Sequence, residues 1–539
     1  MKRFPWTAAA AIVITVFVVA LDLRFALHAG GLWRDESATA HFATLPAVGD
    51  IVSRLHLDNF PCLSLAVIRA WSAAFGPGDA GYRALGFLVA LGVLAALWLH
   101  GALIGNKGTG TDFQNPILKI GTCPLISLVL FAANPVVVRA ISSIRPYGIG
   151  ATLLVLAHAL VWRATEAPSR RSFATAAIVS VLAVQTLYQN AILLGAIGVS
   201  AAAAIAVIRP RSAWIPLAIG GVAAVSLLPY AGFVRRAQEW SVLNRGSVTL
   251  DHLVSVFGSM LSSAGPAAVL LAALAALVAA AAGLRRSRQD GGRTLYALLT
   301  LVLATLGFLF FLRLLSMPTQ IWYYVLPSAV AAVSIDTILA AAPKPRVAAR
   351  GVAALVGLAL VASGAWAGTA VRQTNADLVA AAVRAAARPG DLVLVHPWYC
   401  AITLTRYGTG SAAIVSIPPL DDLSIHRYDL LKARMQETDP MAALRPRIDG
   451  ALRSGARVWY AGDLELPPPG TDPQAPPPAP VPGIGWNEGA YLDAWSAQAA
   501  GWLRSEAREV RQVQVEAPGP VNPLETLPLY VFSGWRGPA

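Results

Sequence analysis

The chain has 539 residues, of which 56% are hydrophobic and only 13% are charged. A soluble domain is closer to one quarter charged, so this composition excludes an ordinary soluble protein. The formal net charge is +13, but the cations cluster in short loops between apolar runs rather than on one soluble face. This pattern is typical of cytoplasmic loops and argues against nucleic-acid binding.

Apolar runs long enough to cross a bilayer as helices recur along the first two thirds of the chain. We expect a helical polytopic membrane protein with about eleven spans of about 20 residues each. The expected spans are 6–25, 82–104, 121–139, 147–164, 172–189, 190–208, 213–233, 265–284, 294–313, 321–342 and 351–369.

The orientation follows from the basic residues between these spans. Five loops that would face inward all carry lysine or arginine, which places the N-terminus in the cytoplasm under the positive-inside rule. The start, with Lys2 and Arg3 before the first run, is interpreted as a retained signal anchor. The first outer loop, 29–81, contains an apolar stripe over 63–75, which is consistent with a helix on the membrane surface or with packing against the spans.

Hydropathy drops at about residue 369, which divides the chain into a transmembrane module, 1–369, and a soluble extracytoplasmic domain, 370–539. A helix over 377–387 precedes an apolar run at 391–396, and a second apolar run follows at 457–460. This alternation predicts a small α/β domain. A Pro-rich linker covers 467–483, followed by a helix near 488–508 and strands near 509–516 and 528–533.

Two adjacent acids, Asp35 and Glu36, follow the first span in a protein where acids are scarce. Between Asp112 and Glu239, for example, the only acid is Glu166. Acids beside a bilayer cost free energy unless they face water or a polar cavity, which makes this pair a candidate functional site. The alternative is that Asp35 only caps a helix that starts at Ser37 or Ala38.

Arginines on the outer side run against the positive-inside rule, and this makes them candidates for a functional role. Arg139 and Arg145 have few acids nearby, and Arg145 is followed by Pro146 and Tyr147 at the outer junction of two helices. An arginine there can hold a phosphate with two parallel hydrogen bonds, and the tyrosine adds a donor. The alternative is an arginine that reaches to lipid headgroups.

These features together suggest one reaction. A carboxylate takes a proton from an acceptor hydroxyl, while arginines hold a phosphate leaving group. A sugar linked to a lipid phosphate supplies that leaving group without ATP. Tyr323 and Tyr324, at an outer helix end, would line the donor cavity or belong to an aromatic interface belt.

The sequence Trp33-Arg34-Asp35-Glu36 resembles the acidic motif of the GT-C membrane glycosyltransferases. The likeness is to bacterial relatives of the dolichyl-phosphate-mannose–protein mannosyltransferases and of the lipid A aminoarabinose transferases. It continues through 38–75 and 81–85, at 145–147, at Tyr188, at 323–327 and at 388–393.

This resemblance implies an inverting transfer of a sugar from a polyprenyl phosphate to a hydroxyl of a lipid, glycan or protein, in a bacterial plasma membrane. Asp35 would be the general base, and Glu36 would position the acceptor or tune the base. Asp58 is a candidate second acid, although the chain has Asp58-Asn59-Phe60-Pro61-Cys62 where relatives often have Asp-x-His-Pro-Pro. That departure leaves a divalent metal open, because the sequence offers no full set of ligands.

Two other classes of protein fit parts of the pattern. A transporter or flippase of a lipid-linked substrate would use the same outer charges, but the sequence lacks the paired inverted repeats typical of transporters. A membrane scaffold would leave the acid pair and Arg145 with only structural roles.

Overall fold

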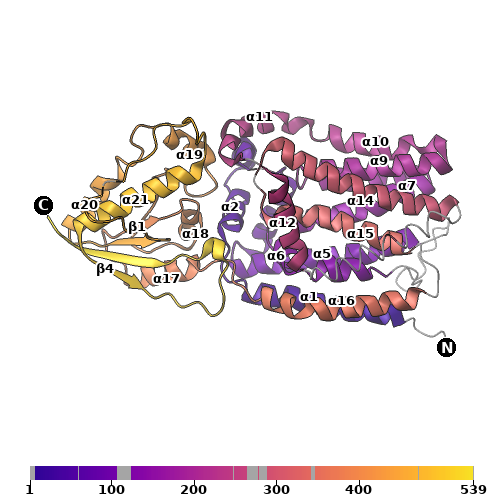
Figure 1. Ribbon diagram of the computed structural model, residues 1–539, viewed down its shortest axis with the longest axis horizontal. Coiled ribbons are helices and arrows are strands. Elements are labelled where there is room, and N and C mark those ends of the chain that lie inside the picture. The colour runs from indigo at the N-terminus through magenta and orange to yellow at the C-terminus, as the bar shows by residue number, and fades with distance from the viewer. Residues whose placement is uncertain are drawn as a thin grey trace. The chain divides into compact units, whose positions relative to one another are not determined.

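A computed structural model gives the fold (Figure 1). It describes residues 6–58, 60–105, 123–246, 248–263, 277, 288–317, 319–340, 346–471 and 473–537. The chain divides into two compact units, each made of several chain segments. The first comprises residues 1–27, 59–232 and 247–369, and the second comprises residues 28–58, 233–246 and 370–539. The second unit therefore includes two segments that the sequence places within the transmembrane module.

The first unit is helical. Among the described residues, seven helices are long and apolar enough to cross a membrane, which confirms a multi-pass protein but not the expected number of eleven spans. The helices of this unit are α1 (Trp6–His28), α4 (Leu63–Phe75), α5 (Asp79–Gly105), α6 (Pro135–Ile141), α7 (Tyr147–Glu166), α8 (Arg170–Val184), α9 (Asn190–Ile208), α10 (Trp214–Val225), α12 (Leu250–Ser263), α14 (Arg288–Leu315), α15 (Val325–Ala340) and α16 (Arg346–Gly368).

Several expected spans differ in detail from the helices observed. The span expected over 121–139 is a short π-helix, Ser127–Ala132, followed by a break and then α6. The break is local in origin, because the Asn134 side chain accepts a hydrogen bond from the Val136 N–H (2.9 Å) and starts a new helix there. The boundary near 188–190 is confirmed, since α8 ends at Val184 and α9 begins at Asn190. The span expected over 265–284 lies outside the described residues except for Leu277.

The helix expected in the first outer loop is α4. Its residues Leu65 and Ile68 are buried, and the Trp71 indole N–H donates to the Gly81 carbonyl (2.9 Å) at the start of α5. One face of this helix therefore packs within the first unit. This agrees with the interpretation that the apolar stripe over 63–75 packs against the spans.

The second unit is a mixed α/β domain, as the sequence predicts. Its five-stranded sheet has the order β2-β1-β3-β5-β4, in which β1 is parallel to β2 and β3, and β5 is antiparallel to β3 and β4. Its strands are β1 (Leu392–Val395), β2 (Ala413–Ser416), β3 (Val458–Ala461), β4 (Ala507–Val513) and β5 (Leu529–Trp535). Its helices are α2 (Arg34–Ala43), α3 (Val48–Arg54), most of α11 (Ala231–Trp240), α17 (Ala376–Ala386), α18 (Cys400–Tyr407), α19 (Tyr428–Met435), α20 (Leu444–Arg453) and α21 (Glu488–Glu506).

Alternate residues of β1 define the two faces of this sheet. Leu392 and Leu394 belong to a core cluster with residues of α19, α20 and α21, whereas Val393 and Val395 belong to a cluster with residues of α17 and α18. Both faces of the sheet are thus covered by helices, as parallel strands require (Figure 1). Ala38 of α2 joins the first of these clusters, so the segment that carries the acid pair is part of the core of this domain.

Candidate active site

Asp35 is the second residue of α2, in the second unit. The structure corrects the interpretation of Asp35 as the cap of a helix starting at Ser37 or Ala38, because the helix begins at Arg34 and the residue before it is Trp33. Glu36, fully buried, takes the local structural role instead, since its carboxylate accepts a hydrogen bond from the Trp33 N–H (3.4 Å). The Asp35 side chain therefore does not cap the N-terminus of α2.

The Asp35 side chain is 19% exposed and lies between two basic groups. Its Oδ1 is 3.5 Å from Nε2 of His426 and 3.7 Å from Nε of Arg34. A carboxylate that is partly exposed and held by an imidazole and a guanidinium can accept a proton from a bound hydroxyl.

The sheet explains how residues distant in sequence come together at Asp35. Tyr399 follows β1, and His426 follows β2, so both come from the carboxyl ends of neighbouring parallel strands. Ligand sites of open α/β sheets lie at such ends. The Arg34 guanidinium lies 4.2 Å from the centre of the Tyr399 ring, which adds a cation–π contact.

Two carboxyl groups, the buried Glu525 and the half-buried Glu488, interact electrostatically with Arg34. The backbone N–H of Arg34 donates to Oε1 of Glu525 (2.6 Å), and burial raises the pKa of Glu525 to about 8. Burial likewise raises the pKa of Glu488 to about 7, against the attraction of Arg34. Oε2 of each glutamate is buried without a hydrogen-bond partner among the described residues. The pKa values of both glutamates are thus shifted toward neutral pH, because desolvation disfavours the ionised carboxylate.

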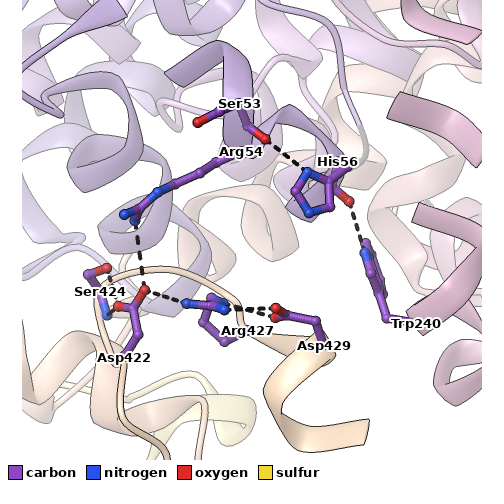
Figure 2. A network of polar contacts seen from close by, with 8 residues as sticks. All are labelled: Ser53, Arg54, His56, Trp240, Asp422, Ser424, Arg427 and Asp429. Atoms are coloured by element: carbon purple, nitrogen blue, oxygen red, sulfur yellow. Dashed lines mark hydrogen bonds and ion pairs between the residues drawn. The ribbon is translucent and has the colours of Figure 1, made fainter. Parts of the chain in front are cut away.

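The loop that carries His426 is held by a network of charged groups (Figure 2). Asp422 accepts hydrogen bonds from the Ser424 N–H (3.0 Å) and from Arg427 (2.8 Å). Arg427 also contacts both carboxylate oxygens of Asp429, at 2.9 and 2.7 Å. Burial alone would raise the pKa of Asp422, but the hydrogen bonds from Ser424 and Arg427 hold it below its ordinary value. Arg54 of α3 approaches Asp422 at 3.8 Å, which ties the loop to the segment that contains Asp35.

Stacked rings fix the orientation of the His426 imidazole. Its ring lies nearly parallel to that of Tyr428, with 6.0 Å between ring centres, and Tyr428 stacks in turn on Trp240 at 5.3 Å. Trp240 donates its indole N–H to the His56 carbonyl (2.8 Å), as Figure 2 shows. The buried Trp398 meets His426 edge-on. Such packing restricts the ring and directs its nitrogen toward Asp35.

The residues predicted to bind phosphate belong to the first unit. Arg139 lies on α6, Arg145 in the turn before α7, and Tyr147 is the first residue of α7. Arg145 is half-buried, with its guanidinium 4.9 Å from the centre of the Phe60 ring. Tyr147 is buried. The role of these three residues in binding a donor stays a prediction.

The remaining candidate residues, Tyr323, Tyr324 and Asp58, have different surroundings. Tyr324 is buried, with its hydroxyl 3.0 Å from that of Thr319, and it lines an apolar cavity of about 120 Å³. Tyr323 is half-buried with its ring edge-on to Trp322. Asp58, in the second unit, is half-buried after the short helix Leu55–Leu57. The other residues that line the cavity include Phe257 and Met260 of α12, Phe308 and Leu309 of α14, and Pro327 and Ala331 of α15.

The described residues contain no group of three or more His, Cys, Asp or Glu side chains placed to hold a metal ion. Asp35 and His426 are adjacent, but they are two groups only. The residues present therefore do not form a ligand set for the divalent metal that the sequence left open.

The sequence alone does not point to His426 or Glu525 as neighbours of the acid pair. Arg34 and Glu525 are separated by 491 positions, and no local periodicity connects them. One signal was available for His426. The short apolar run Ala413–Ser416 is a strand, and the loop after it belongs to the same edge of the sheet as the loop after 391–396.

Comparisons with known proteins support the fold. No protein-family model matches the sequence, and no curated protein matches it. Among solved structures, ArnT from Cupriavidus metallidurans bound to undecaprenyl phosphate is similar, with 13% identity and a TM-score of 0.50 over 85% of this chain and 94% of that one. The Archaeoglobus fulgidus oligosaccharyltransferase, tethered with an acceptor peptide containing the NVT sequon, has 12% identity and a TM-score of 0.45 over 100% of this chain and 74% of that one. The similarity to ArnT confirms the expected GT-C-like fold, and at this identity it shows the fold alone.

Proposed function

We propose that this protein transfers a sugar from a polyprenyl-phosphate donor to a hydroxyl group of a lipid, glycan or protein acceptor, on the extracytoplasmic side of the membrane. The observation that carries the proposal is the Asp35–His426 pair on a GT-C-like fold. The carboxylate is partly exposed, is not used as a helix cap, and lies 3.5 Å from His426, in the loop that follows the parallel strand β2.

In the proposed reaction, Asp35 accepts the proton of the acceptor hydroxyl as its oxygen attacks the anomeric carbon. The bond between that carbon and the phosphate oxygen breaks, and its electron pair leaves with the polyprenyl phosphate. A single displacement of this kind inverts the anomeric configuration. His426 and Arg34, which lie 3.5 and 3.7 Å from Oδ1 of Asp35, keep the carboxylate oriented before the transfer.

The donor would be bound by residues of the first unit. Arg145, with Arg139 and Tyr147, would hold the phosphate through charge-assisted hydrogen bonds. The cavity lined by Tyr324, Phe308 and Met260 is apolar, and at about 120 Å³ it would take only a short part of an isoprenoid chain. Because the similar ArnT structure has undecaprenyl phosphate bound, this class of carrier is the first to test.

The test is transfer by the purified full-length protein in nanodiscs, with short-chain polyprenyl-phosphate sugars and a panel of hydroxyl acceptors. We expect Asp35→Asn to lower kcat by a factor of about 10² to 10⁴, the usual contribution of a general base, with little change in melting temperature. Asp421→Asn is the matched control, because Asp421 belongs to the same unit and its side chain is 89% exposed.

Three outcomes would count against the proposal. Full activity of a folded Asp35→Asn variant would remove Asp35 as the base. Retention of the anomeric configuration in the product would require a different mechanism. Movement of the lipid-linked sugar across the bilayer without any product would favour the transporter instead.

A further inference from the structure

Three consecutive backbone N–H groups lead into α2, and each has a side-chain acceptor. The Leu32 N–H donates to the Tyr407 hydroxyl (2.6 Å), and the Arg34 N–H donates to Oε1 of Glu525 (2.6 Å). The Trp33 N–H between them donates to Glu36 (3.4 Å), within the same segment. The first and third acceptors thus come from the C-terminal part of the chain, on α18 and in the loop before β5.

The hydrogen bonds from Trp33 and Arg34 lie at the N-terminus of α2, and the one from Leu32 lies one residue before the N-cap. The first N–H groups of a helix have no partner within the helix, so the groups that accept from them set the position and direction of its first turn. Asp35 is the next residue after Arg34, and in the observed orientation of the helix its carboxylate lies 3.5 Å from Nε2 of His426. The side chain that accepts the hydrogen bond from the Arg34 N–H therefore helps to position the Asp35 carboxylate.

The surroundings of both acceptors leave little room for movement. Glu525 is 1% exposed and faces Arg34, Asp35, Tyr399 and Cys400. The Tyr407 hydroxyl lies so close to Gly31 that a Cβ at that position would be 2.7 Å from it. A side chain on residue 31 would displace the tyrosine, so glycine is required for this close approach.

We infer that Tyr407 and Glu525 of the C-terminal domain are positioning residues for Asp35, and that holding the acid-bearing segment is a principal task of this domain. The inference rests on the proposed function in so far as Asp35 is the base. Neither residue contacts the substrate in this account. Both act through the backbone at the start of α2.

The experiment combines hydrogen exchange with steady-state kinetics on the full-length protein. We expect Glu525→Ala and Tyr407→Phe to speed amide exchange in the peptide that covers residues 30–40, because each leaves one N–H without its acceptor. Glu525→Gln keeps an oxygen acceptor of the same shape and should exchange like the wild type. The matched control is Glu516→Ala, since Glu516 is exposed and lies in the same C-terminal segment.

In the transfer assay, Glu525→Ala should lower kcat about tenfold with the KM for the donor unchanged, whereas Glu525→Gln should stay within about twofold of wild type. If Glu525→Ala and Tyr407→Phe leave exchange in 30–40 unchanged, the inference is wrong, whatever their activity. If exchange responds as expected but the wild-type protein transfers no sugar, the proposed function fails and the positioning role stands. Should Glu525→Ala not fold, Tyr407→Phe, which removes only a hydroxyl, decides the question.

Discussion

The buried carboxyl of Glu525 makes a quantitative prediction about stability and pH. Burial raises its pKa from an ordinary value of 4.5 to about 8. The folded state therefore holds the proton of Glu525 more tightly than the unfolded state does. Between these two pKa values the unfolded chain carries fewer protons at this site, so the free energy of unfolding must fall as pH rises.

The size of the effect follows from the shift. Each pKa unit corresponds to about 1.4 kcal/mol. Above pH 8 the whole shift therefore lowers the free energy of unfolding by on the order of 5 kcal/mol relative to acidic pH. Between pH 6 and pH 8 the loss is about 2 kcal/mol. For a unit of about 200 residues, this loss corresponds to about 4–8 °C in melting temperature.

Glu525→Gln removes the titration while keeping the oxygen that accepts from Arg34. We expect the melting temperature of the variant, followed by tryptophan fluorescence, to gain about 4–8 °C relative to wild type on going from pH 6 to pH 8. Contributions from groups that do not interact with Glu525 cancel in the difference between the two proteins. Parallel pH profiles for wild type and Glu525→Gln would refute the reasoning, and Glu516→Gln, at an exposed position, should give such parallel profiles.

Two further predictions concern His426 and Asp391. His426→Gln should lower kcat about tenfold without changing the melting temperature, because it removes the imidazole whose Nε2 lies 3.5 Å from Asp35, and unchanged kinetics would exclude a role for the imidazole. Asp391→Asn should lower the free energy of unfolding by about 3–5 kcal/mol, because this fully buried carboxylate accepts hydrogen bonds from Arg457 and Trp459. Burial, which would raise the pKa of Asp391, is outweighed by those hydrogen bonds, so its contribution should persist above about pH 4 and disappear only in stronger acid. A melting temperature of Asp391→Asn equal to that of wild type at pH 7 would contradict this account.

Local signals in the sequence were sufficient for much of the fold. Apolar runs and their breaks predicted α7 and α9 to within two residues and the break between α8 and α9, whereas α14 begins six residues earlier and α8 ends five residues earlier than expected. In the C-terminal domain the expected strands at 391–396 and 457–460 correspond to β1 and β3. These elements are predictable because burial on one or two faces leaves a periodic pattern within a short window.

The candidate site was predicted in part, and for a physical reason. Asp35 stands out because a carboxylate beside a bilayer is costly, and that argument needs only its neighbours in sequence. Its partners do not stand out, since His426 and Glu525 are ordinary residues of a soluble domain until the sheet brings their loops to α2. The assignment of residues 28–58 to the same unit as the C-terminal domain depends on contacts between distant segments.

The hydrogen bond between Arg34 and Glu525 also constrains how the protein is made. The two residues are 491 positions apart, so at about 5–20 residues per second the ribosome adds Glu525 about 25–100 s after Arg34. During that interval the start of α2 has been synthesised but lacks one of its acceptors. The hydrogen bond at the Arg34 N–H can therefore form only after residue 525 has been synthesised, and a nascent chain stopped before that residue would carry Asp35 without this support.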